Sequence, residues 1–231
     1  MRAGLWAWGV AVMVAGCGPT PAQQYGEALF NDPKLSPSQY NAFSCATCHA
    51  TTQEEGQLYT GLSLVGAASR PTWWGGYELT LLDAVNFCYT AFMRGTTPLD
   101  QEDPKSRALY EYLVSLSPRS TAPVQPFTLV RDIAEVPRGS KSRGAEVYRA
   151  ACLECHGEKD TGAARLTPLA PVLPNVSQEY GQLFPNATPA LVFIEKVRHG
   201  RFFGVGGNMP PYSLEALSDE DLGALLSYLG L

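Results

Sequence analysis

The sequence has little charge and no excess of basic residues. Only 17% of its 231 residues are charged, and 22 acidic residues outnumber 17 lysines and arginines, for a formal net charge of −5. Binding to a nucleic acid backbone requires a basic surface, and no lysine-rich or arginine-rich run provides one. Hydrophobic residues make up 45% of the chain, which argues against extensive disorder. The composition predicts a globular protein that does not bind nucleic acid.

Common enzyme motifs are also missing. We find no glycine-rich phosphate loop between a strand and a helix, and no serine nucleophile motif. Histidine is scarce, with three residues in the chain. Outside the two motifs described below, no further cluster of metal ligands is visible, so any catalysis is expected at those two sites.

No internal segment is long and apolar enough to predict a transmembrane helix. The apolar run 4–14, preceded by Arg2, is too short to cross a bilayer and is typical of an export signal. It is followed by Val-Ala-Gly and then Cys17, which resembles a bacterial lipobox. That resemblance implies a signal peptide over 1–16, lipidation of Cys17, a tether over 17–25 and a location on the periplasmic side of a bacterial membrane. The alternative is an ordinary signal peptide with a cysteine near its cleavage site.

Two five-residue motifs contain four of the six cysteines and two of the three histidines. Both have the pattern Cys-x-x-Cys-His, which is typical of c-type haem attachment. Two thiols one helical turn apart can each form a thioether with a haem vinyl group, while the adjacent histidine binds the iron. The pattern therefore predicts two covalently bound haem c groups, each with a proximal histidine. The motifs are Cys45-Ala46-Thr47-Cys48-His49 and Cys152-Leu153-Glu154-Cys155-His156.

Two other chemistries use paired cysteines, and neither fits this spacing. Four-cysteine zinc sites place their pairs about 15 to 20 residues apart. Here the pairs are far more distant, and each has its own histidine. A thioredoxin-like redox motif belongs in a βαβ unit, which neither segment predicts.

The segments around the two motifs resemble each other, which indicates an internal repeat. A short amphipathic helix is predicted before each motif, at 26–30 and at 144–148. A capped helix is predicted at the end of each copy, beginning after Asp103 in the first and after Ser218 in the second. Between these helices lies a proline-containing linker over 117–139.

Each copy also has a methionine between the motif and the last helix. Met93 precedes Tyr112 by the same number of residues as Met209 precedes Tyr228. A further helix is predicted before each methionine, at 79–92 and at 189–199.

With these elements, each copy resembles a class I cytochrome c domain. The second copy is the closer match, because Met-Pro-Pro-Tyr at 209–212 is similar to the distal-methionine loop of that family. The resemblance implies an all-α fold of two tandem cytochrome c-like domains, over 26–116 and 140–231. It also implies that His156 and Met209 are the axial ligands of the second haem.

The distal ligand of the first haem has two candidates, Met93 and Cys88. The repeat favours Met93 as the metal ligand. Val-Asn-Phe-Cys at 85–88, with a methionine five residues later, resembles a segment of the dihaem cytochromes of sulfur oxidation, including thiosulfate dehydrogenases. That resemblance implies Cys88 as the ligand. The remaining histidine, His199, is an alternative distal ligand or docking contact, but its position near a predicted helix end favours a cation at that end.

The sequence thus favours an electron carrier or cytochrome subunit that exchanges electrons with redox partner proteins. The alternative is a haem-based oxidoreductase of inorganic sulfur, with the first haem as its active site. Arg70 and Arg94 are the basic residues closest in sequence to that site, where an anionic substrate would bind.

Overall fold

The computed structural model describes residues 18–53, 61–117, 121–132, 135–179, 183–200 and 208–231. Over these residues the chain is helical and contains no strand, only an isolated bridge between Trp73 and Glu78. None of its helices is long and apolar enough to span a membrane. The predicted signal peptide and the lipidation site Cys17 lie outside the described residues.

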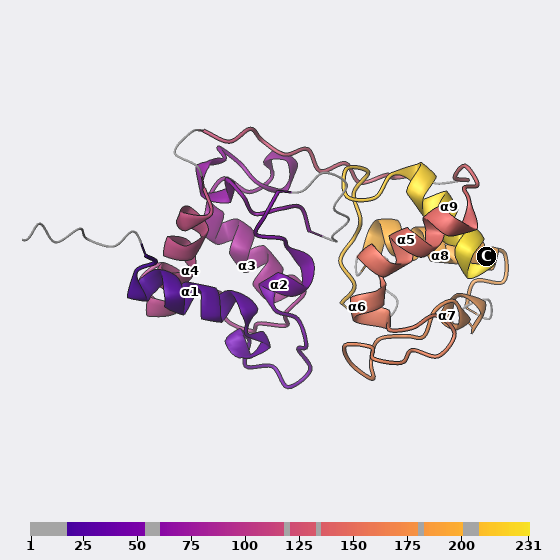
Figure 1. The fold of residues 1–231 in the computed structure, drawn as a ribbon, viewed down its shortest axis with the longest axis horizontal. Coiled ribbons are helices and arrows are strands. Elements are labelled where there is room, and N and C mark those ends of the chain that lie inside the picture. The colour runs from indigo at the N-terminus through magenta and orange to yellow at the C-terminus, as the bar shows by residue number, and fades with distance from the viewer. Residues whose placement is uncertain (1–17, 54–60, 118–120, 133–134, 180–182, 201–207) are drawn as a thin grey trace, which may run out of the picture.

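The helices form two groups that follow each other in the chain (Figure 1). Residues 121–132, which contain no regular secondary structure, run between the groups. The first group contains α1 (Pro21–Asn31), η1 (Pro33–Leu35), α2 (Cys45–Cys48), η2 (Ala67–Ser69), η3 (Trp74–Gly76), α3 (Leu81–Ala91) and α4 (Pro104–Ser115). The second contains α5 (Lys141–Ala151), α6 (Leu153–His156), α7 (Asn175–Glu179), α8 (Pro189–His199) and α9 (Asp219–Leu229).

Local capping determines where most of these helices begin. Side chains of Asp103, Thr188 and Ser218 accept hydrogen bonds from backbone N–H groups in the first turns of α4, α8 and α9. These three predicted starts are confirmed. Helix α1 begins earlier than the predicted segment 26–30, because Thr20 forms a capping box before Pro21.

The first and last helices of each group pack closely together. Helix α1 packs against α4, and α5 packs against α9. A glycine lies at each contact: a Cβ atom on Gly26 would be 2.0 Å from the Ala108 carbonyl oxygen, and one on Gly144 would be 2.0 Å from the Ala224 carbonyl oxygen. The two groups therefore repeat one helix pairing with the same requirement for a glycine.

Replacing Gly144 with alanine should lower the free energy of unfolding by about 2–4 kcal/mol, because the new methyl group would push α5 away from α9. Urea unfolding of the purified protein measures the change. Lys141→Ala, an exposed substitution in the same helix, is the matched control and should change stability by less than about 0.5 kcal/mol. Equal effects of the two substitutions would show that the close contact between α5 and α9 is not required.

Each group has its own hydrophobic core. The first core includes Phe30, Met93 and Leu109, and the second includes Val147 and Leu225. In each group the Cys-x-x-Cys-His segment lies beside the core, where α2 and α6 face the other group (Figure 1).

Candidate functional site

The first motif forms one turn of helix. Ser44 precedes the turn, and the backbone N–H of His49 donates to the Cys45 carbonyl oxygen at 3.0 Å. The ring Nδ1 of His49 lies 2.8 Å from the carbonyl oxygen of Leu62. Because a carbonyl only accepts, Nδ1 carries the hydrogen and Nε2 keeps its lone pair for a metal.

The second motif repeats this arrangement. The backbone N–H of His156 donates to the Cys152 carbonyl oxygen at 2.9 Å, and its ring Nδ1 lies 2.8 Å from the carbonyl oxygen of Pro171. In His156, too, Nε2 is therefore the ring nitrogen that keeps a lone pair for a metal. A carbonyl from the following loop orients the imidazole in both halves.

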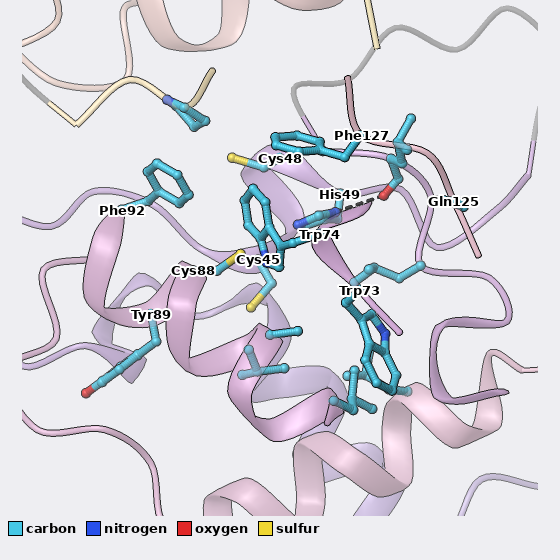
Figure 2. Close-up of a pocket in the computed structure, with 18 of the residues that line it drawn as sticks. Cys45, Cys48, His49, Trp73, Trp74, Cys88, Tyr89, Phe92, Gln125 and Phe127 are labelled. Carbon is cyan, nitrogen blue, oxygen red and sulfur yellow. Dashed lines mark hydrogen bonds between the residues drawn. The ribbon is translucent and has the colours of Figure 1, made fainter. Parts of the chain in front are cut away.

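A cavity of about 190 Å³ adjoins the first motif. Its lining is mostly apolar and includes Cys45, Cys48 and His49, as well as Cys88 from α3 (Figure 2). Arg70 also lines the cavity and is 91% buried, since its exposed fraction is 9%. Its Nη2 donates to two carbonyl oxygens, while its Nε has no hydrogen-bond partner among the described residues.

Aromatic side chains close one side of the first cavity. The ring of Trp74 lies 4.6 Å from that of Phe87 and 4.9 Å from that of Phe127, centroid to centroid. Phe127 belongs to the linker, so the linker forms part of the wall (Figure 2). The next residue, Thr128, is bound to Glu215 of the second half through its backbone N–H at 2.9 Å and its hydroxyl at 2.6 Å.

A second cavity, of about 220 Å³, adjoins the second motif and is lined by Cys152, Cys155, His156 and Met209. The structure thus brings the predicted proximal histidine and the predicted distal methionine of this half to one cavity. Gly200, with φ 51°, lies directly against the methionine loop: a Cβ atom there would be 2.4 Å from the Met209 carbonyl oxygen.

Two buried residues support the methionine loop. The backbone N–H of Tyr212 donates to the Val197 carbonyl oxygen, and its hydroxyl donates to the Ala151 carbonyl oxygen at 2.5 Å.

Arg198 has no exposed surface and is ion-paired with Asp219 at 2.6 Å. It also donates to the carbonyl oxygens of three loop residues, which are Tyr212, Ser213 and Leu217. This role of Arg198 could not be predicted from the sequence, because its partners are separated from it in the chain and nothing in the local pattern indicates its burial.

Burial changes the acid–base properties of both motifs. It raises the pKa of Cys45 to about 11 and that of Cys152 to about 12, and it lowers the pKa values of His49 and His156. The histidines are therefore neutral, as metal ligation requires. The thiols are protonated and, among the described cysteines, none forms a disulfide, which is unlike the reactive thiolate of a redox enzyme.

Both candidate distal ligands of the first site line the first cavity. Figure 2 shows Cys88 pointing into it near Cys45, and the two sulfur groups are close enough that Cys45 contributes, after burial, to raising the pKa of Cys88 to about 12. Met93 is 5% exposed and also packs in the first hydrophobic core.

His199 is not among the residues that line the two cavities. Its Nδ1 is 2.6 Å from a carboxylate oxygen of Glu195, and its Nε2 is 2.6 Å from the carbonyl oxygen of Val130 in the linker. Both ring nitrogens are therefore engaged. This geometry argues against an axial role and gives His199 a structural one, as a contact between α8 and the linker.

The two cavities share part of their walls. Cys48, Phe43 and Pro210 line both of them. Cys155 is also near Cys48: burial is the main cause that raises the pKa of Cys48, and the charge of Cys155 is the next. The amide of Asn208 joins the halves by donating to the Phe92 carbonyl oxygen at 3.0 Å.

These features fit haem c. Each site offers two thiols on one helical turn, a neutral imidazole whose Nε2 keeps its lone pair, a sulfur ligand candidate from another segment and a mostly apolar cavity. In the first site the guanidinium of Arg70 is buried, and its Nε has no partner in the described part of the chain, which suits it to an anionic group such as a haem carboxylate.

The second half is similar to a known family. Residues 139–229 match the family described as cytochrome C oxidase, cbb3-type, subunit III. The matched region includes the second motif, Met209 and helices α5 to α9. No curated protein matches the chain. The match supports a c-type cytochrome with a helical fold, covalently bound haem c and a role in electron transfer with redox partner proteins.

Proposed function

We propose that the chain is a dihaem cytochrome with two tandem cytochrome c-like domains, which relays single electrons between a donor and an acceptor protein. The observation that carries the proposal is the recurrence of one site in both halves. In each, a Cys-x-x-Cys-His turn faces an apolar cavity, and a backbone carbonyl holds the histidine Nδ1. Bound haem iron supplies the one-electron chemistry, and the protein supplies ligands, burial and charge.

In this proposal each candidate ligand has one role. The paired cysteines form the thioethers, and the two histidines bind iron through Nε2. Met209 is the distal ligand in the second site, and Met93, with Cys88 as the alternative, is the distal ligand in the first. The thioether-forming residues are Cys45, Cys48, Cys152 and Cys155.

The shared wall supports a relay between the two sites. Cys48 lines both cavities, and Cys155 lies near it. Cys48 would hold one haem and Cys155 the other, each by a thioether bond at this shared wall. An electron that enters one half would then have a short route to the other without a mobile carrier.

The lipobox-like sequence that ends at Cys17 supports an anchored location. Lipidation there would hold the protein at a bacterial membrane on the periplasmic side. Covalent attachment of haem is compatible with export of the chain to that side. Labelling with a fatty acid analogue, compared between the wild type and Cys17→Ala, tests this location.

A second candidate function is the oxidation of inorganic sulfur at the first haem. The position of Cys88 beside Cys45 favours it, because a thiolate ligand would lower the potential of that iron. Arg70 is the buried cation of that cavity and would face an anionic substrate.

The haem content of exported, purified protein tests the dihaem proposal. We expect two haems per chain in a pyridine haemochrome assay, and one in each of the double variants Cys45→Ala/Cys48→Ala and Cys152→Ala/Cys155→Ala. Cys88→Ser is the matched control for loss of a cavity cysteine and should keep two. A wild-type protein with a single haem would contradict the proposal.

A further inference from the structure

The first half contributes a charged residue to the cavity of the second half. Arg94 follows Met93 beyond the end of α3, yet it lines the second cavity together with Cys155, His156 and Met209. Its backbone has φ 58°, a left-handed conformation that glycine adopts with less strain. Backbone strain of this kind is often found at functional sites, so the surroundings of Arg94 are relevant to function.

A hydrogen bond two residues before Arg94 joins the two halves at this cavity. The side-chain amide of Asn208 donates to the carbonyl oxygen of Phe92 at 3.0 Å. Phe92 is two residues before Arg94, and Asn208 directly precedes the distal ligand Met209. The segments that carry Met93 and Met209 are therefore fixed against each other across the boundary between the halves.

The charged side chains that line the second cavity are of one sign. Among the described residues that line it, the charged ones are Arg94 and Lys196, both cations, and none is acidic. Arg94 forms no ion pair within the described part of the chain. Haem carries two carboxylates, so it is an occupant whose negative groups would match these cations.

We infer that the second haem site is built from both halves, with Arg94 as a cationic binding residue for the haem that the second half ligates. This inference rests on the proposed function. A cation in the wall of the cavity favours the reduced iron, because reduction adds an electron to the site. Through Arg94 the first half thus raises the potential of the second haem.

Redox titration of the full dihaem protein tests this inference. The couple that belongs to the second haem is identified as the one displaced by Met209→His. In Arg94→Gln we expect the equilibrium constant for reduction of that haem to fall about three- to tenfold, tenfold corresponding to about 59 mV for one electron. In Arg94→Lys, which keeps the charge, we expect a change within about twofold.

Lys105→Gln is the matched control. Lys105 is exposed, as Arg94 is, but it does not line the second cavity, so loss of its positive charge should change the constant by less than about twofold. Arg94→Gln with two bound haems and a shift no larger than that of Lys105→Gln would overturn the inference.

Haem content of the same samples separates this inference from the proposed function. Fewer than two haems in the wild type would contradict the proposed function itself. Loss of the second haem in Arg94→Gln but not in Arg94→Lys would support the binding role of the charge. Loss in both variants would show that Arg94 serves folding, and would overturn the inference.

Discussion

Replacing Met209 with histidine should lower the midpoint potential of the second haem by on the order of 0.2 V, within the span of about 0.8 V over which axial ligands set haem potentials. A thioether ligand stabilises ferrous iron, and an imidazole stabilises the ferric state by comparison. We expect the substitution to act at the iron because of where Met209 lies. Met209 lines the same cavity as His156, and its loop is held by the hydrogen bonds of Tyr212 and Arg198.

Redox titration followed in the visible spectrum measures this shift. Glu220→Gln, at an exposed position on α9, is the control and should leave both couples nearly unchanged. The first haem should also keep its potential in Met209→His. If neither couple moved in this variant, Met209 would not be an iron ligand.

Local sequence predicted where three of the helices begin. The starts of α4, α8 and α9 follow from Asp103, Thr188 and Ser218, because a capping side chain acts within its own first turn. The cavities also follow in part from the sequence, because Cys-x-x-Cys-His is a local pattern whose chemistry depends on one helical turn.

Features that depend on long-range packing were not predictable in this way. Arg198 lies near the end of α8, and no local pattern indicates that its side chain is fully buried among carbonyl groups of the methionine loop. Arg94 was considered only for the first haem, since it lies next to Met93 in sequence. Its place at the second cavity depends on how the two halves pack, as in the contact between Asn208 and Phe92.

The same limit applies to the linker. Its prolines predicted a segment without regular structure, and residues 121–132 have none. That Phe127 would cover the first cavity while Thr128 binds Glu215 could not be derived from composition. Each contact joins residues that no short-range pattern connects.

At the first haem, Met93→Leu should lower the midpoint potential by on the order of 0.1–0.2 V and abolish the spectral signature of a thioether ligand, whereas Cys88→Ser should preserve both. Met93 holds the same place in its repeat as Met209, and it lines the first cavity. Burial raises the pKa of Cys88 to about 12, which favours the neutral thiol. Iron would have to displace that proton before a thiolate could bind.

The two variants test the competing ligands against each other, with optical and electron paramagnetic resonance spectra of the oxidised protein as the measurement. They also provide matched controls, because both remove a sulfur from the same cavity. A thiolate signature in the wild type that disappears in Cys88→Ser would place Cys88 on the iron and contradict the assignment of Met93. The first haem would then have a lowered potential beside the buried cation Arg70, and oxidation of an inorganic sulfur anion would become the function to assay.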